Sequence, residues 1–215
     1  MAQEGKPTLT YLKLHGKAEQ IRLLLAAANA EFNDIRLSFE EWPAFKATLT
    51  GPKQVPLWTT TEGKTLNQGN AILRTLGRQY GFYNDLTAEE YFLVDWALET
   101  SLDLSISRAY RAWMNDLSEE ETAAAVASFG TFNSEIAAKL SETGKNYFAG
   151  DKLTIADFTI LAHYLQMPQS DSPKACTASC AALVAETPVV GAYLERVKAH
   201  VADYLAARAS HGHPI

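Results

Sequence analysis

The most constraining feature of this sequence is the change in hydrophobic spacing within residues 8–81, from strand to helix and back. Thr8 to Leu14 (TLTYLKL) is short and rich in Thr, Tyr and Leu, which predicts a strand that ends at Gly16. From Lys17 onward the apolar residues recur at intervals of three and four. This spacing predicts a helix whose buried face consists of Ile21, Leu24, Leu25 and Ala28.

The rest of this region repeats the alternation. Residues 32–37 return to strand spacing, and residues 55–60 and 64–66 flank the dipeptide Glu62-Gly63, which suits a hairpin connection. Residues 70–79 are predicted to be helical, with inward positions Ile72, Leu73 and Leu76. The predicted order is therefore β-α-β followed by β-β-α, and we expect one small α/β domain over residues 1–81.

Residues 87–215 carry helical patterns only, after an expected linker at residues 82–86. Thr87 with Glu90 and Ser118 with Glu121 are capping-box patterns, each of which marks a helix start. The clearest helix is the last one, with apolar residues three and four apart at Val190, Tyr193, Leu194, Val197, Val201 and Leu205. The connection over residues 167–187 is rich in Pro, Ser and Asp, so we expect a surface loop there.

Composition limits the possible partners. The chain has 215 residues, of which 47% are hydrophobic, enough for one large domain or two small ones. A net charge of −6 and a pI near 5.4 argue against a nucleic-acid partner, because counterion release requires basic side chains. The longest clean apolar run is residues 23–28, and the amino terminus lacks a signal-peptide pattern. We expect no membrane partner and a cytoplasmic location.

The two cysteines argue against redox chemistry. Cys176 and Cys180 are too few for a disulfide framework, and no cysteine stands at the start of the first predicted helix, where a dithiol site would need one. We expect unpaired thiols. The histidines of the C-terminal tail, His211 and His213, predict a frayed polar end.

Five short motifs are distributed over most of the chain: residues 11–25 (YLKLHGKAEQIRLLL), Glu41-Trp42-Pro43 with Lys46, Gln54-Val55-Pro56, residues 66–73 (LNQGNAIL) and residues 153–158 (LTIADF). In this order they resemble cytosolic glutathione transferases of the alpha, mu, pi and sigma group, with sigma class nearest. The resemblance implies a thioredoxin-like domain of βαβββα type followed by an all-helical domain. It also implies that Thr154 to Asp157 is a buried N-capping box.

The implied activity is conjugation of reduced glutathione, as co-substrate, to apolar electrophiles, with the Tyr11 hydroxyl stabilising the thiolate. Taken alone, a strand tyrosine is more often a packed aromatic, and the flanking motifs make catalysis the better interpretation. The resemblance places the glutathione-binding residues at Tyr11, Lys17, Trp42, Lys46, Gln54, Val55, Pro56, Gln68, Gly69 and Asp103. Trp42 and Lys46 would contact the glycyl end, and Val55, before a cis Pro56, would pair with the cysteinyl unit.

Two positions depart from the family pattern. Gly69 stands where Ser or Thr is usual after Gln68, so a hydroxyl donor to the γ-glutamyl carboxylate is missing and weaker affinity is expected. Lys17 stands where Arg is usual, which keeps the charge but loses the bidentate fork.

Three carboxylates recur along the first helix of the second domain, at Asp95, Glu99 and Asp103. Their spacing alone predicts a solvated acidic face. By resemblance, Asp103 would reach across a two-fold interface to the partner's γ-glutamyl amine, which implies a homodimer. Leu102 replaces an acidic residue of related metal sites, so we predict no metal.

An electrophile pocket is expected between Tyr11 and the second domain. We expect it to be lined by Leu12, Leu14, His15, Tyr110, Trp113 and Met114. For the last three residues a helix core is an equally good interpretation, although the neighbouring Arg108 and Arg111 would be unusual in a closed core. Two functions remain open from sequence. One is a glutathione transferase, and the other is a non-catalytic protein of the same fold that binds ligands or assembles with partners, which Gly69 and Lys17 favour.

Overall fold

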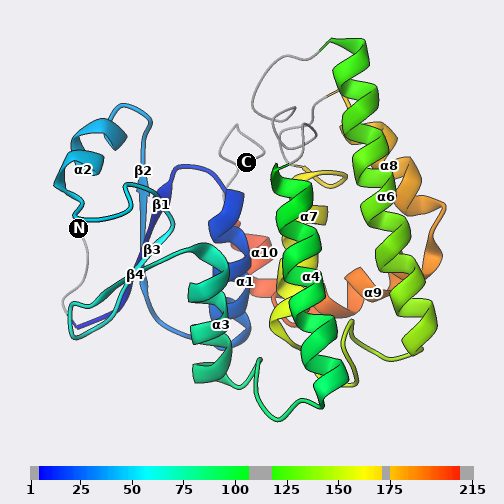
Figure 1. Cartoon of the computed structure of the whole chain (residues 1–215), viewed down its shortest axis with the longest axis horizontal. Helices are drawn as coiled ribbons and strands as arrows, with labels where there is room; N and C mark the ends of the chain where they lie inside the picture. The colour runs from blue at the N-terminus through cyan, green and yellow to red at the C-terminus, as the bar shows by residue number, and fades with distance from the viewer. Residues whose placement is uncertain (1–4, 107–117, 171–174, 209–215) are drawn as a thin grey trace.

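The computed structural model describes residues 5–106, 118–170 and 175–208. A thioredoxin-like domain comes first, and the described part of the chain after it is helical. Figure 1 shows the sheet at one end of the molecule and the long helices α4 and α6 toward the other. The elements of the first domain are β1 (Thr8–Leu12), the 3-10 turn η1 (Gly16–Ala18), α1 (Glu19–Ala27), β2 (Asn33–Leu37), α2 (Trp42–Thr48), β3 (Leu57–Thr59), β4 (Thr65–Asn67) and α3 (Gly69–Tyr80).

The sheet has four strands in the order β2-β1-β3-β4. β1 runs parallel to β2 and antiparallel to β3, and β3 and β4 form a hairpin. Gly63, at φ +82°, makes the hairpin turn possible because a residue with a side chain rarely adopts this conformation. The predicted order of elements is confirmed. Helix α2 was not predicted, because none of its seven residues is buried and no apolar stripe marks it.

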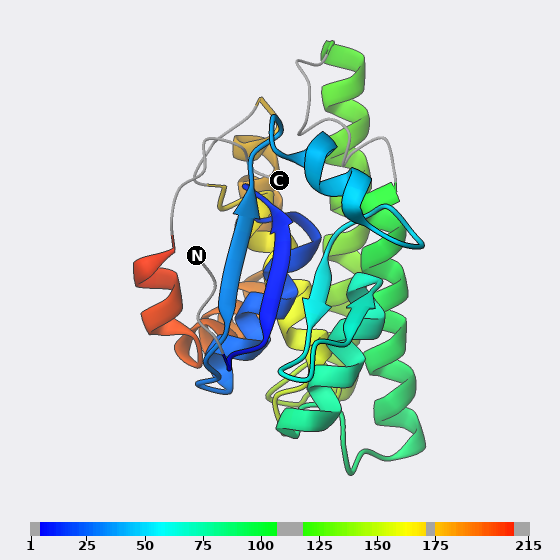
Figure 2. The same cartoon turned by 90° about the vertical axis from the view of Figure 1, so that its left-hand side faces the viewer.

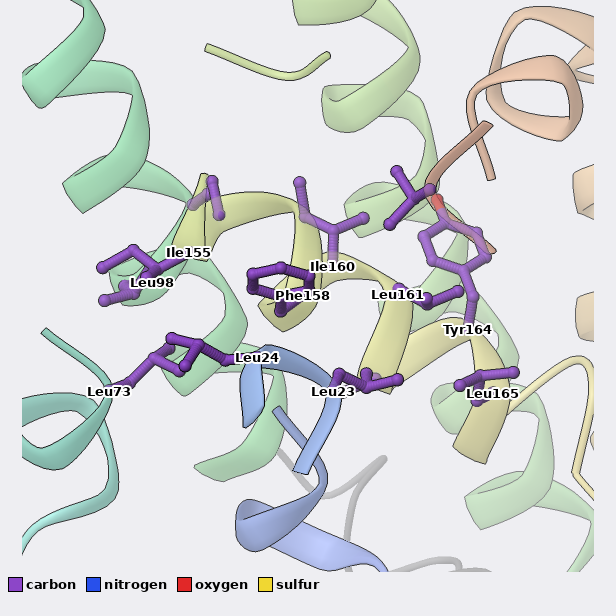
Figure 3. Close-up of a cluster of buried hydrophobic side chains, with 14 of the residues drawn as sticks. Leu23, Leu24, Leu73, Leu98, Ile155, Phe158, Ile160, Leu161, Tyr164 and Leu165 are labelled. Atoms are coloured by element: carbon purple, nitrogen blue, oxygen red, sulfur yellow. The ribbon is translucent and has the colours of Figure 1, made fainter. Parts of the chain in front are cut away.

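The helical part packs on one face of the sheet. α1 and α3 cover that face, whereas α2 lies on the opposite side, as Figures 1 and 2 show. The helices that follow are α4 (Ala88–Ile106), α6 (Glu119–Thr143), α7 (Ile155–Gln166), α8 (Thr177–Ala185), α9 (Pro188–Ala199) and α10 (Ala202–Ala207). Every residue of α7 is buried, and this helix packs on α1, α3, α4 and α9. The core therefore continues between the two domains, and Figure 3 shows its side chains from α1, α3, α4 and α7.

All three predicted helix starts are confirmed. Ser118 and Glu121 bond reciprocally at the start of α6, and Thr154 and Asp157 do so at the start of α7. Thr87 accepts a hydrogen bond from the Glu90 N–H, and its own N–H donates to the Glu90 carboxylate. Short-range capping signals of this kind act within one turn, so they can be recognised without tertiary information.

Two predictions for the last fifty residues were wrong. The single helix expected over 190–205 is two helices, broken around Val201, because α10 turns back and brings Tyr204 to Glu19 of the first domain. The loop expected over 167–187 contains α8, which packs against α6 and α9 and buries Cys180. Both Pro residues and two of the three Ser residues of this connection precede the helix, and only Ser179 lies within it.

Among the described residues, no single helix is long and apolar enough to cross a membrane. α8 and α9 would satisfy the length and composition criterion only as a pair, bent by 103°.

Candidate active site

Tyr11 lies near the end of β1, and its hydroxyl is hydrogen-bonded to the main chain of the turn that follows. The Tyr11 oxygen accepts a hydrogen bond from the Lys17 N–H at 3.1 Å, so its own proton remains a donor for another group. Gly16, at φ +43°, makes the turn this close: a Cβ there would lie 2.5 Å from the Tyr11 oxygen. The side chain is buried, and burial raises the pKa of Tyr11, with Lys17 and Arg22 opposing the shift. The phenol is therefore a neutral donor at pH 7.

A cavity of about 120 Å³ opens between the two domains beside this turn. The first domain lines it with Gly16, Lys17, Gln20, Gln68, Gly69 and Asn70. α4 contributes Leu98, Ser101, Leu102 and Ser105, and α7 contributes Thr159, Ala162, His163 and Gln166. Tyr11 is not part of the wall, but its hydroxyl is one hydrogen bond away from the main chain that forms it.

The start of α3 forms one side of this cavity. Gln68 precedes the helix at φ +72°, a conformation that is rare for a residue with a side chain and that is found most often at functional sites. Gly69 is the first helical residue, and its side of the helix faces Lys17, Gln20 and Pro56: a Cβ at Gly69 would lie 3.5–3.7 Å from their nearest atoms. The Val55–Pro56 bond is cis, as the resemblance implies. Three segments distant in sequence, residues 17–20, 55–56 and 68–69, thus meet at a helix N-terminus, which favours an anion.

The residues expected at the glycyl end lie together on α2. The Lys46 ammonium is 5.8 Å from the centre of the Trp42 ring, so the two side chains form a cation–π pair. Lys46 is exposed and Trp42 is half-buried. Gln54 is also exposed, one residue before the cis bond.

The expected electrophile-pocket residues are only partly placed. Leu12 is half-buried, Leu14 and His15 are buried, and none of the three lines the cavity. His15 instead donates from Nδ1 to the Glu19 carboxylate at 3.1 Å. Three further expected residues fall outside the described residues, namely Tyr110, Trp113 and Met114.

The carboxylates of α4 do not form a uniform acidic face. Arg74 of α3 donates to Asp95 and Glu99, with nitrogen to oxygen distances of 2.9–3.1 Å, so these two acids join the two domains. Asp103 is exposed on the wall of a separate hollow of about 380 Å³ between α4 and α6. Among the described residues, no group of three or more His, Cys, Asp or Glu side chains could hold a metal ion.

Sequence reasoning missed two polar arrangements next to the cavity. The first joins three helices: the Thr159 hydroxyl donates to Gln20, and the Gln20 amide donates to Asn70. The second surrounds Glu19, a fully buried carboxylate on α1. The only sequence signal for the arrangement around Glu19 was the presence of two charged residues, Glu19 and Arg22, in a helix whose other buried residues are mostly apolar.

Known proteins with related sequences share one family. Residues 7–78 match the model for the glutathione S-transferase N-terminal domain, and residues 107–208 match the model for the C-terminal domain. The class-mu 28 kDa glutathione S-transferase of Schistosoma japonicum is 30% identical over 161 residues, 72% of this chain and 77% of the relative. Probable glutathione S-transferase 7 of Caenorhabditis elegans is 30% identical over 207 residues, 93% of this chain and 95% of the relative.

Solved structures give the same result. The glutathione S-transferase of Ascaris lumbricoides superposes with a TM-score of 0.81 at 25% identity, covering 98% of this chain and 100% of its own. The monomeric glutathione S-transferase Na-GST-3 of Necator americanus superposes with a TM-score of 0.79 at 25% identity, covering 95% of this chain and 98% of its own.

Proposed function

This chain belongs to the glutathione S-transferase family, and we propose that it conjugates reduced glutathione to small electrophiles with Tyr11 stabilising the thiolate. The observation that carries the proposal is the geometry of the Tyr11 hydroxyl. It accepts from the Lys17 N–H, keeps its own proton for donation, and lies directly behind the wall of the cavity between the domains. A protonated donor at this place would favour the charged form of a thiol bound there.

The thiolate is the form that attacks electrophiles. A free thiol with a pKa near 8.5 is only about 3% ionised at pH 7, whereas a pKa lowered by about two units gives roughly three quarters thiolate. The lower pKa also costs about eightfold in intrinsic nucleophilicity, so ionisation alone yields only about a threefold gain in rate. Most of the acceleration would therefore come from holding the electrophile beside the sulfur.

Glutathione would lie along the edge of the first domain. Trp42 and Lys46 would meet the glycyl carboxylate, the main chain of Val55 would pair with the cysteinyl unit, and Gln68 with the first N–H groups of α3 would hold the γ-glutamyl carboxylate. The positive φ of Gln68, the cis Pro56 and the juxtaposition of Gly69 with Lys17 support this arrangement. Lys17 would add a cation, and Gln54 a polar contact, to the bound glutathione.

The electrophile would occupy the part of the cavity between α4 and α7. Its described wall is mixed: Leu98, Leu102 and Ala162 are apolar, and the remaining α4 and α7 side chains carry hydroxyl, imidazole or amide groups. This composition favours electrophiles with an apolar body and a polar substituent over purely apolar ones.

We further propose a sigma-class enzyme that works as a cytoplasmic homodimer in detoxification. The motif over residues 11–25 supports the class. Exposed Asp103 beside the hollow between α4 and α6, together with Phe92, which is 60% exposed on α4, supports a dimer through this face.

The test is Tyr11→Phe, with Tyr147→Phe as the matched control, because the Tyr147 hydroxyl bonds His200 away from the cavity. We expect Tyr11→Phe to lower the conjugation rate with a general aryl halide far more than it weakens glutathione binding. The pKa of the bound thiol, followed by thiolate absorbance against pH, should rise by about two units, or about 2.7 kcal/mol. The control should leave rate and thiol pKa unchanged.

An unchanged rate and thiol pKa in Tyr11→Phe would show that another donor activates the sulfur. If calorimetry on the wild type detected no glutathione binding at all, the non-catalytic alternative would replace the enzyme.

A further inference from the structure

A buried charged cluster lies directly under the turn that carries the Tyr11 contact, and the C-terminal segment completes it. We call it the Glu19 cluster: His15, Glu19, Arg22, Tyr204 and Arg208. Glu19 and His15 are fully buried, and Arg22 is 1% exposed. An ionised carboxylate costs too much free energy at such a place unless donors surround it.

Glu19 receives donors from both ends of the chain. Arg208 donates from Nε to one carboxylate oxygen at 2.7 Å, and the Tyr204 hydroxyl donates to the other at 3.0 Å. His15 Nδ1 also donates to this second oxygen, at 3.1 Å. Burial alone would raise the pKa of Glu19, but the bond to His15 and the charges of Arg208 and Arg22 hold it well below its usual value. The carboxylate is therefore ionised, and two of its donors come from the last described residues.

The same cluster is hydrogen-bonded to the main chain of the turn over residues 14–17. Arg22 Nη1 lies 3.5 Å from the Glu19 carboxylate and donates to the carbonyl oxygens of Leu14 and His15, both at 3.2 Å. Gly16 and Lys17 follow at once, and the Lys17 N–H is the donor to the Tyr11 hydroxyl. The contact path from Arg208 to Tyr11 thus passes through the Glu19 carboxylate, the Arg22 guanidinium and the 14–17 turn. Asp34 of β2 holds the same guanidinium from its other side, through Nε and Nη2 at 3.1–3.3 Å.

The turn has little freedom of its own to compensate for a loss. Gly16 has a positive φ, and a Cβ built on it would lie within 2.8 Å of the Tyr11 and Leu14 side chains, so these side chains leave the turn no space on that side. Any rotation that moves the carbonyls of Leu14 and His15 would therefore also move the Lys17 N–H relative to the phenol.

We propose that Tyr204 and Arg208 are positioning residues: by bonding Glu19 they hold the 14–17 turn in place and so keep the Tyr11 hydroxyl aimed at the bound thiol. This inference rests on the proposed role of Tyr11. Neither Tyr204 nor Arg208 lines the cavity between the domains, so the proposed effect of both residues passes through Glu19.

The experiment is a double-mutant cycle between Arg208→Ala and Tyr11→Phe in the full chain, with Arg196→Ala as the control. Arg196, on neighbouring α9, is exposed and donates from Nε to the Asn146 carbonyl oxygen at 3.0 Å, away from Glu19. The readouts are kcat at saturating glutathione, the glutathione KM, and the pKa of the bound thiol.

We expect Arg208→Ala to lower kcat about tenfold and to raise the thiol pKa by about one unit, with less than about a twofold change in glutathione KM. On the Tyr11→Phe background the same substitution should cost less than about twofold, because the hydroxyl it positions is already absent. Arg208→Lys should recover part of the loss. Arg196→Ala should behave as wild type in every readout.

Equal losses on both backgrounds, or a rise in glutathione KM with an unchanged thiol pKa, would overturn the inference and leave Arg208 a packing residue. If Arg208→Ala does not fold, Tyr204→Phe removes a single hydroxyl and is expected to lower kcat about threefold with the same dependence on Tyr11. The proposed function is tested separately by the Tyr11→Phe single variant. If that variant conjugates glutathione at the wild-type rate, both proposals are wrong.

Discussion

Gln68 and Gly69 stand where β4 gives way to α3, and their backbone geometry decides how an anion can approach the helix. Gln68 takes a left-handed φ that favours glycine, while Gly69, the glycine beside it, is helical and does not need its freedom. The unusual conformation therefore falls on the residue with the side chain. Strain of this kind persists only where the surrounding structure holds it, which is common at ligand sites.

At Gly69 the structure leaves room for a side chain. A Cβ would meet Gln20, Pro56 and Lys17 only at ordinary contact distances. We expect Gly69→Ser to tighten glutathione binding by up to about 1.5 kcal/mol, because it adds a hydroxyl beside the proposed carboxylate position. Isothermal calorimetry measures the gain, and Gly69→Ala supplies the Cβ without the hydroxyl. Equal affinity of the Ser and Ala variants would contradict the proposed position of the γ-glutamyl carboxylate.

His163 makes stability depend on pH. Burial lowers its pKa from 6.5 to about 4, so below pH 6.5 the unfolded chain takes up a proton that the folded protein does not. The free energy of unfolding should fall by about 2 kcal/mol between pH 7 and pH 5 on account of this residue. Urea unfolding of wild type and His163→Gln at both pH values tests this. The variant should lose most of that dependence, and an identical slope in both proteins would show that the imidazole is protonated in the folded state.

At the scale of elements, the two capping boxes at α6 and α7 share one pattern but differ in burial. The box at α6 is exposed, and the Glu121 carboxylate accepts from the N–H and the hydroxyl of Ser118. At α7 the Asp157 carboxylate is fully buried and accepts from the main chain of Thr154 and Phe148 and from the hydroxyls of Thr154 and Tyr193. α7 lies in the middle of the core, so its start is joined to α9 and to the preceding loop.

The same substitution should therefore have different effects at the two boxes. We expect Asp157→Ala to lower the free energy of unfolding by about 3 kcal/mol or more, because four buried donors lose their acceptor. Glu121→Ala, the matched exposed change, should cost about 1 kcal/mol. Denaturant unfolding of both variants at pH 7 measures the difference. Similar losses would mean that the buried box acts only as a local cap.

At the scale of the whole molecule, one face formed by α4 and α6 is left uncovered by the other described residues. Phe92 is 60% exposed on α4. The hollow of about 380 Å³ between α4 and α6 has a mixed lining of aromatic, acidic, hydroxyl and aliphatic side chains, which includes Trp96, Phe132, Asp103 and Glu135. A monomeric relative is known, so the fold alone does not decide the oligomeric state.

We expect sedimentation at micromolar concentration to give a homodimer, with Phe92→Glu shifting it to monomers, because a charge would replace an apolar side chain in the proposed interface. Phe39→Glu, at a phenylalanine that is 50% exposed in the first domain, is the control and should remain dimeric. A wild-type species of about 24 kDa, the mass of one chain, would remove the dimer and with it any role of Asp103 toward a partner subunit.

Much of the fold could be predicted from the sequence, because its signals are local. The switch in spacing at Lys17, the hairpin at Gly63 and the capping boxes at Ser118 and Thr154 each act within a few residues, and each is confirmed. The resemblance likewise depends on short motifs, and its cis Pro56 is confirmed. The proposed glutathione contacts remain predictions.

Only the tertiary structure decided what surrounds Tyr11. The bonds from Tyr204 and Arg208 to Glu19 span 185 and 189 residues, and Arg74 reaches Asp95 and Glu99 from another domain. No spacing along the chain records such pairings, because they depend on how the helices pack. For the same reason the apolar spacing over residues 190–205 predicted one continuous helix and missed the break between α9 and α10. This break brings Tyr204 and Arg208 into contact with Glu19, under the candidate catalytic turn.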